Sequence, residues 1–240
     1  MKSDKQEAGG VVPRASNLRS YFAEFVVVFV GVALAFAVEN YREASNERTV
    51  GDEYLSAFRQ DLTADLQMLQ EQQDAREAQL TNARTVLEFF EGKPNDPASF
   101  FEAYWPVLWE LKTTPNRNTM DEVLSSGSLR LIRDPKIRTG LLDLYATYGQ
   151  IAFFEEHMAR DFDMYLYDPT FSSVRIQFRG PWNDTPENRQ AVETLLGDRR
   201  IENGLRLLVA NLDFDDESLL PLLGAARSQV EQLLQQIPAR

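Results

Sequence analysis

An uninterrupted apolar run near the amino terminus dominates the hydrophobic pattern of this chain. Between Phe25 and Val38 no residue has a polar side chain, and Tyr21 and Tyr41 lie on either side of the run. A helix that rises about 1.5 Å per residue covers roughly 30 Å from Tyr21 to Tyr41, which is the hydrocarbon thickness of a bilayer. Tyrosine rings are enriched at the membrane interface. The pattern therefore predicts a transmembrane helix over residues 18–42, with Tyr21 and Tyr41 as interfacial anchors.

A cleaved signal peptide is the alternative to a retained membrane helix. Ala35-Phe36-Ala37 follows an apolar core and has the small-x-small pattern of a cleavage site. Against cleavage, Glu24 lies inside the stretch that is purely apolar in a signal peptide. Glu39 then leads directly into a long helical pattern, without the proline or polar linker of a mature amino terminus. We therefore expect the apolar helix to remain as a membrane anchor.

Basic residues are more frequent before the apolar run than directly after it. Those that flank the run are, in chain order, Lys2, Lys5, Arg14, Arg19, Arg42 and Arg48. Cytoplasmic flanks of membrane helices carry an excess of lysine and arginine. We therefore predict a cytoplasmic tail over residues 1–17 and an exported carboxy-terminal domain.

Glu24, Gly31 and Ala35 are spaced so that all three lie on nearly the same face of a helix. Gly31-x-x-x-Ala35 is a small-xxx-small spacing, which lets two helix backbones approach closely. This stripe favours association of the span with a second helix, in another copy of the chain or in a partner, with Glu24 paired to a donor there. The alternative is a carboxylate that extends to the lipid headgroups, beside small residues without a role.

A second apolar pattern follows the span, with steps of three and four residues that are typical of one face of a helix. Its apolar members are Leu55, Phe58, Leu62, Leu66, Leu69, Leu80, Ala83, Leu87 and Phe90. Gln73 and Arg76 interrupt the stripe, which argues against a sustained coiled coil. We predict a stalk helix over residues 43–92 that continues from the span, packs its far half into the domain and ends at Gly92-Lys93-Pro94.

Residues 93–240 carry the start signals of several further helices. The predicted N-caps are Asp96, Asp134, Thr185, Asp198 and Asp216, and proline follows the first three of them. Only Ser173–Phe178 alternates like a strand, and a lone strand has nothing to pair with, so we expect an extended loop there. The sequence therefore predicts an all-α fold, in which residues 93–240 form an irregular helical bundle together with the stalk.

Thr119-x-x-Glu122 is a capping box, which predicts the start of a short helix. At the end of this helix we expect Gly127 to take the left-handed conformation and the hydroxyl groups of Ser125 and Ser126 to satisfy the chain end. A nucleophilic serine is the alternative for this element. No Gly-x-Ser-x-Gly elbow surrounds the two serines, so we favour the structural role.

Two groups of residues carry a family resemblance: Glu24, Gly31, Ala35 and the Asn40-Tyr41 exit, and then Thr119, Glu122, Leu124, Ser125, Ser126, Gly127 and Asp134. In this order they resemble a family of bacterial membrane-anchored proteins known only as a domain of unknown function. In that family Gly stands before the acid and Trp at the exit, where this chain has Ala23 and Tyr41. The resemblance reaches about Tyr148 and implies a membrane-anchored helical domain without implying an activity. For a bacterial chain, the predicted location is the inner membrane, with a periplasmic or otherwise extracytoplasmic domain.

Composition narrows the possible functions. The chain has 25 Lys and Arg residues against 37 Asp and Glu residues, a formal charge of −12, so a nucleic-acid backbone would repel it. A single histidine and no cysteine exclude most nucleophilic triads and zinc sites. His157 with Asp161, and the acids Asp213–Glu217, are possible cation ligands, but an ion pair and a helix cap explain them more simply. We therefore predict no metal, no cofactor and no nucleic-acid partner.

The sequence leaves three functional hypotheses. We favour a non-enzymatic membrane-anchored interaction or scaffold protein, with the lipid bilayer and a protein partner or second copy as its contacts. Aromatic residues that would serve as core or, at an exposed edge, as a partner patch are Phe100, Phe101, Tyr104, Trp105 and Trp109. The alternative is a sensory or ligand-binding module that signals through the continuous helix and needs an apolar pocket with a few convergent polar groups. A hydrolase built on paired carboxylates is the third, and no sequence feature supports it.

Overall fold

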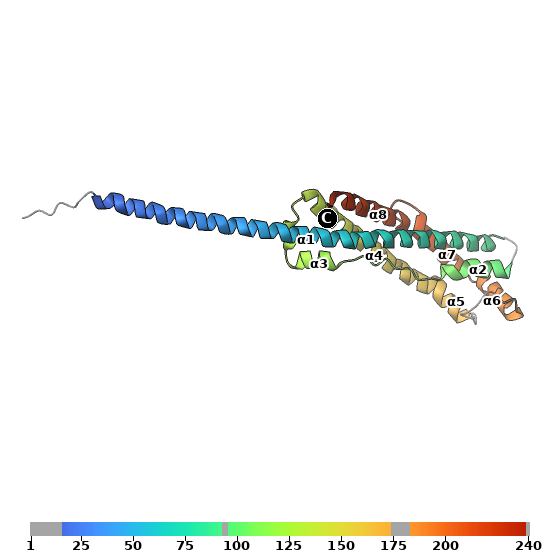
Figure 1. Ribbon diagram of the computed structural model, residues 1–240. Coiled ribbons are helices and arrows are strands. Elements are labelled where there is room, and N and C mark those ends of the chain that lie inside the picture. Colours follow the sequence, from blue (N-terminus) through green and yellow to red (C-terminus); the bar gives the residue numbers. More distant parts are fainter. Residues whose placement is uncertain (1–15, 93–95, 174–182, 239–240) are drawn as a thin grey trace, which may run out of the picture. The chain divides into compact units, whose positions relative to one another are not determined.

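All regular structure in the described part of the chain is helical, which confirms the predicted all-α fold (Figure 1). The computed structural model describes residues 16–92, 96–173 and 183–238. In chain order the elements are α1 (Ser16–Phe90), α2 (Pro97–Val107), α3 (Asn118–Ser125), the 3-10 turn η1 (Ser128–Leu131), α4 (Pro135–Phe162), the π-helical turn η2 (Asp163–Tyr167), α5 (Asp168–Ser173), α6 (Pro186–Leu196), α7 (Arg199–Asp213) and α8 (Leu219–Gln236).

The chain divides into two compact units, Met1–Val50 and Gly51–Arg240. Helix α1 continues from the first unit into the second without a break, as the sequence predicts for the span and the stalk. The division between the two units falls at Gly51, within the predicted stalk of residues 43–92. From Phe58 onward the apolar stripe of α1 is part of the domain core, so this part of the helix packs into the domain.

The first unit contains the apolar half of α1. Its most apolar window of 18 residues has a mean hydropathy of 2.3, and none of that window is buried by protein. This part of α1 is long and apolar enough to cross a membrane. Tyr21 and Tyr41, at the two ends, have exposed fractions of 67% and 74%. Lys2, Lys5, Arg14 and the rest of the tail before Ser16 lie outside the described residues, so the orientation stays a prediction.

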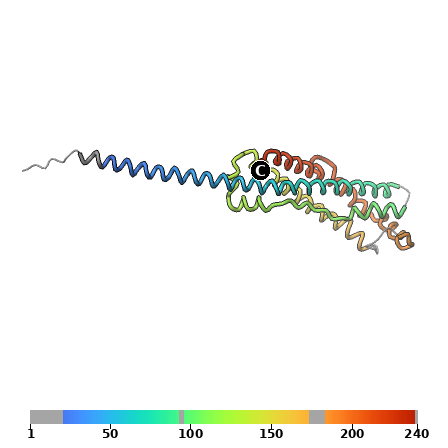
Figure 2. The backbone as a smooth tube through the Cα atoms, in the orientation of Figure 1, coloured from blue at the N-terminus to red at the C-terminus, as the bar shows by residue number. Residues whose placement is uncertain are grey.

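Helices α1, α4 and α8 run beside one another at the centre of the domain (Figure 2). Arg59 of α1 donates hydrogen bonds to the backbone oxygens of Leu234 and Ile237, which lie at the end of α8, at 2.9 Å and 2.7 Å. Tyr148 of α4 reaches Asp65 of α1. Fully buried core side chains on the three helices are Phe58, Leu62, Leu69, Ala83, Val86, Leu141, Leu144, Leu219, Leu223, Ala226 and Val230.

Most helix starts match the local sequence signals. Asp134, Thr185 and Asp198 are N-caps whose side chains accept from backbone N–H groups two or three residues later. Asp96 is the N-cap of α2, and its carboxylate accepts from the Ser99 hydroxyl instead of a backbone N–H. Pro106 lies inside α2, which ends at Val107.

Two predicted caps are wrong. Thr119 is not an N-cap, because α3 begins at Asn118 and the buried Thr119 hydroxyl donates to Asp61 of α1 at 2.6 Å. Its supposed capping-box partner, Glu122, accepts from the Tyr54 hydroxyl of α1 at 3.1 Å. The acid at position 216 does not cap α8 either, since the cap is Ser218.

The turn after α3 has the geometry expected from its sequence. Gly127 has φ of +67°, which is the left-handed region. The hydroxyl groups of Ser125 and Ser126 donate to the backbone oxygen of Glu122 at 3.0 Å and 2.8 Å. Ser173 is the last residue of α5, and the rest of the segment with strand-like alternation, residues 174–178, lies outside the described residues, as do Lys93 and Pro94.

Gly51 gives a direct test of how closely α1 packs against the domain. A β-carbon at this position would lie 2.5 Å from the backbone oxygen of Leu131. We expect Gly51→Ala to lower the free energy of unfolding by about 1–3 kcal/mol, since η1 or α1 must shift. Gly149→Ala, inside α4, is the control because its β-carbon meets nothing within 4 Å.

The measurement is urea unfolding of the full chain in detergent, followed by circular dichroism. The control should be unchanged or more stable by up to about 1 kcal/mol, since alanine is the better helix former. Equal effects of the two substitutions would show that α1 does not pack closely on η1.

Candidate functional site: a cleft beside a buried ion pair

A buried ion pair joins α1 to α4 inside the domain. Arg76 Nη2 lies 3.1 Å from Glu155 Oε1, and the two side chains have exposed fractions of 6% and 7%. Burial lowers the pKa of Arg76 from its usual value, and the charge of Glu155 and its hydrogen bond oppose that change. A charge in such a place is costly unless a partner and further hydrogen bonds compensate.

The hydrogen bonds around this pair hold the irregular segment that follows α2. Arg76 Nη2 also donates to the backbone oxygen of Leu111 at 2.6 Å. Glu155 accepts from the backbone N–H of Thr113 at 2.9 Å and from its hydroxyl at 2.8 Å. Gln79 Nε2 donates to the backbone oxygens of Val107 and Trp109 at 2.9 Å and 3.1 Å. The segment is thus fixed across α1 and α4 by side chains that satisfy its backbone.

A second buried carboxylate, Asp65, holds the far end of the same segment. Its Oδ1 accepts from the backbone N–H and the side-chain amide of Asn116, both at 2.9 Å, and its Oδ2 accepts from the Tyr148 hydroxyl at 3.0 Å. Burial raises the pKa of Asp65 above 3.8, while these hydrogen bonds oppose the change. Tyr145 completes the arrangement by donating to the Asn116 backbone oxygen at 2.7 Å. Asp65 is fully enclosed and hydrogen bonded, which is the environment of a structural carboxylate.

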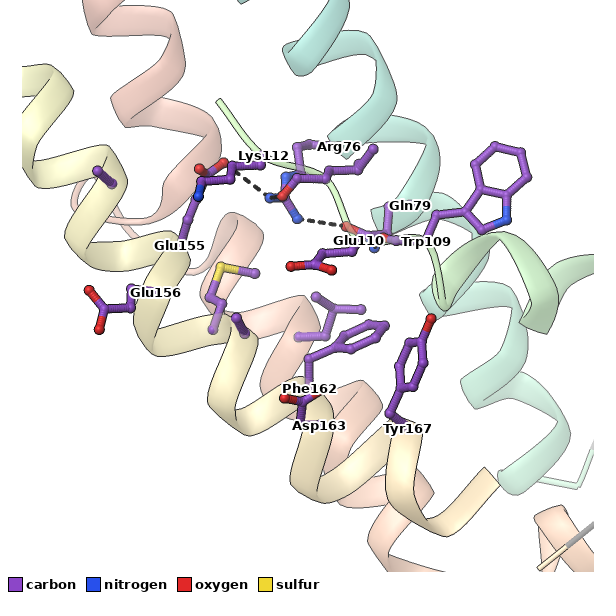
Figure 3. Close-up of a pocket in the computed structure, with 15 residues that line it drawn as sticks. Arg76, Gln79, Trp109, Glu110, Lys112, Glu155, Glu156, Phe162, Asp163 and Tyr167 are labelled. Atoms are coloured by element: carbon purple, nitrogen blue, oxygen red, sulfur yellow. Dashed lines mark hydrogen bonds and ion pairs between the residues drawn. The ribbon is translucent and has the colours of Figure 1, made fainter. Parts of the chain in front are cut away.

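A cleft of about 510 Å³ opens beside the Arg76–Glu155 pair (Figure 3). Arg76, Gln79 and Glu155 form its polar end, where dashed lines in Figure 3 join the three side chains. Met158 and Phe162 of α4, with Leu208 of α7, supply apolar lining. The cleft is partly open to solvent rather than closed, and its size is that of a small-molecule site.

Charged and aromatic side chains lie around the exposed part of the cleft. Glu110 and Lys112 come from the segment held by Arg76, whereas Glu156 and Asp163 come from α4 and η2. All four are exposed. The rings of Phe162 and Tyr167 extend into the cleft, and Trp109, 59% exposed, lies at its edge (Figure 3).

Apart from Arg76 and Trp109, the residues singled out in the sequence and described by the structure lie away from this cleft. Glu24, Gly31 and Ala35 lie exposed in the first unit, and a β-carbon on Gly31 would meet nothing within 4 Å. His157 and Asp161 form an exposed contact of 3.8 Å on one face of α4. Within residues 16–92, 96–173 and 183–238, no three His, Asp or Glu side chains gather as a metal site.

The predicted aromatic cluster divides between core and surface. Phe100 and Tyr104 are buried and stacked at 5.3 Å between ring centroids, and Phe89 meets Phe100 edge to face at 5.7 Å. Trp109 is exposed, and an exposed edge of this cluster is what the partner-patch alternative requires.

The ion pair was visible in the sequence only as an irregularity. Arg76 interrupts an apolar stripe, and Glu155 stands at an apolar-face position between Ile151 and Met158. A charge at a core position of each of two helices is a signal of a buried pair. Which charges meet depends on the packing of α4 against α1, which the pattern does not specify.

No family model, curated protein or solved structure matches this chain.

The ion pair predicts a large difference between two carboxylate substitutions. Glu155→Ala leaves Arg76 buried without its partner and should lower the free energy of unfolding by about 3–5 kcal/mol. Asp213→Ala is the control, because its pair with Arg84 spans 2.9 Å between side chains that are 49% and 54% exposed. An exposed pair is worth about 1 kcal/mol or less.

Urea unfolding of the full-length variants in detergent measures both values. A loss of less than about 1 kcal/mol for Glu155→Ala would contradict the structural role of the pair.

Proposed function

We propose that this chain is a non-enzymatic, single-pass membrane-anchored interaction or scaffold protein with an exported helical domain. This proposal rests on the apolar half of α1, where protein covers none of the most apolar 18-residue window. Such a surface is stable in lipid and costly in water. In this proposal the amino terminus is cytoplasmic, the domain is extracytoplasmic, and the family resemblance supplies the bacterial inner membrane.

The buried polar groups of the domain support a binding rather than a chemical role. Asp65, Arg76 and Glu155 are engaged with backbone groups of the segment after α2 and with side chains on α1 and α4. In a catalytic site, titratable groups would face a cleft where substrate can reach them. Asp65 is fully enclosed, and Arg76 and Glu155, although they line the cleft, use their hydrogen bonds to hold the fold.

The span is proposed to associate with a second helix through Glu24, Gly31 and Ala35. At 100° per residue the three positions lie within about 40° of one another around the helix. All three are exposed, so their face is open to another helix or to lipid. A second copy of the chain is the simplest occupant, since each copy would bring the same small residues and the same carboxylate.

A ligand-binding sensory module is the second candidate, and the cleft beside Arg76 favours it. This candidate requires an apolar pocket with a few convergent polar groups. The cleft combines apolar walls with the Arg76, Gln79 and Glu155 group. Arg76 and Gln79 belong to α1, the same helix that carries the apolar window, so a ligand in the cleft would act next to the helix that enters the proposed span.

Capture from native membranes through a carboxy-terminal tag tests the interaction role. After cross-linking, we expect a reproducible protein partner to be recovered with the wild-type chain. Trp109→Ala and Phe214→Ala compare two exposed aromatic residues, one at the cleft and one between α7 and α8. A partner that docks at the cleft should be lost with the first substitution only. Recovery of no protein above a tag-only control would overturn the interaction proposal.

The same experiment with two differently tagged copies tests the span. Glu24→Gln combined with Gly31→Leu should reduce recovery of the second copy about tenfold, because the small-residue face is filled and the carboxylate removed. Val26→Leu with Val30→Leu changes two exposed apolar positions on the far side of the helix and is the matched control. Unchanged recovery of the second copy with the Glu24 and Gly31 variant would contradict association through this face. The Glu24 carboxylate would then be a group that extends to the lipid headgroups.

A further inference from the structure

The cleft beside Arg76 has the dimensions and walls of a small-molecule site. Its volume is about 510 Å³, inside the range of roughly 300–1,000 Å³ that such sites occupy. One side is apolar, from the buried side chains of Met158 and Leu208 and the half-buried ring of Phe162. An apolar ligand body can therefore lose water against this side.

The charges around the cleft determine which ligands it favours. Arg76 is already paired with Glu155, so the two charges largely neutralise each other. The remaining charged side chains on the lining are Lys112 and three acids, Glu110, Glu156 and Asp163. Acids thus outnumber bases around the open part of the cleft, on a chain whose formal net charge is −12. A cation is attracted there and an anion is repelled.

The aromatic side chains also favour a cation over an anion. The rings of Phe162 and Tyr167 lie 5.3 Å apart between centroids and extend into the cleft, with Trp109 at its edge (Figure 3). The faces of aromatic rings carry partial negative charge and attract cations within about 6 Å of the ring centroid. Asp163 lies on the same wall as the two rings, so a cationic group can meet a carboxylate and an aromatic face together.

We infer that this cleft binds a small organic cation, namely a protonated amine or guanidine attached to an apolar body. The apolar body would lie against Met158, Phe162 and Leu208, and the cation would lie among Tyr167, Asp163 and Glu110. The inference rests on the second candidate function, a ligand-binding module, and gives that module a ligand class.

Three probes with the same apolar body separate charge from hydrophobicity: phenylbutylamine, phenylbutanol and phenylpentanoate. Each is titrated calorimetrically into the full-length chain in phosphatidylcholine nanodiscs, with empty nanodiscs subtracted. We expect the amine to bind saturably and about tenfold more tightly than the alcohol, and the carboxylate to bind most weakly. Equal affinities, or tightest binding of the carboxylate, would overturn the inference.

Variants locate the binding in the cleft. Glu110→Gln with Asp163→Asn should weaken the amine about tenfold and leave the alcohol within about twofold. Glu187→Gln with Glu193→Gln, on α6 and away from the lining, makes the same charge change and should leave the amine unchanged. Loss of amine binding in both pairs would point to general charge attraction and contradict a site in the cleft.

Ala152→Trp fills the cleft from an exposed lining position and should abolish binding of both amine and alcohol. Its thermal unfolding, compared with the wild type, shows whether the domain remains folded. Amine binding that survives in the folded variant would contradict the site. Partner capture from native membranes is measured separately. If the amine does not bind but a partner is still captured, the ligand inference is wrong and the interaction proposal stands.

Discussion

Helix α1 is one continuous helix whose two parts impose opposite requirements on their surroundings. The part in the first unit exposes apolar side chains on every face, and protein covers none of its most apolar window. A helix that is apolar all round is stable only inside a large protein or a membrane. From Gly51 onward the same helix has one apolar face, which is buried in the domain together with charged and amide side chains. The structure leaves the apolar window of the first part uncovered by protein and buries the apolar face of the second part in the domain core.

The polar groups in the domain part of α1 determine how the rest of the domain is placed. Asp65, Arg76 and Gln79 are all buried, and a buried polar group without a partner is destabilising. Their partners are backbone groups of the segment between α2 and α3, together with Tyr148 and Glu155 of α4. The hydrogen bonds of these buried side chains therefore hold in place a segment that lacks regular structure. That segment, held against α1, leaves the cleft between itself and the end of α4.

Local signals were sufficient to predict most helix starts, because an N-cap and its partner lie within a few residues. Asp134, Thr185 and Asp198 are examples. Thr119 was misjudged because its partner, Asp61, lies on another helix. Position 216 was misjudged because several polar residues precede α8, and Ser218 accepts from the backbone N–H groups of Phe214 and Asp215.

The candidate site could not be predicted in the same way. Its polar end needs Arg76 and Glu155 to meet, and its apolar side brings Phe162 together with Leu208 of another helix. Those pairs are far apart in sequence, and helical periodicity specifies which face is buried but not which helix covers it. The patterns of α1 and α4 did each show a charge at a core position, Arg76 and Glu155, and these sequence features pointed toward this region.

The central claim is that the apolar half of α1 stays attached to the domain and remains in lipid. Amino-terminal sequencing of the protein recovered from carbonate-washed membranes tests this claim most directly. The account predicts a chain that remains in the membrane pellet and begins before Tyr21, so that the whole apolar run is retained. A chain that begins at Val38, after the small-x-small pattern, or that is released into the carbonate wash, would contradict it.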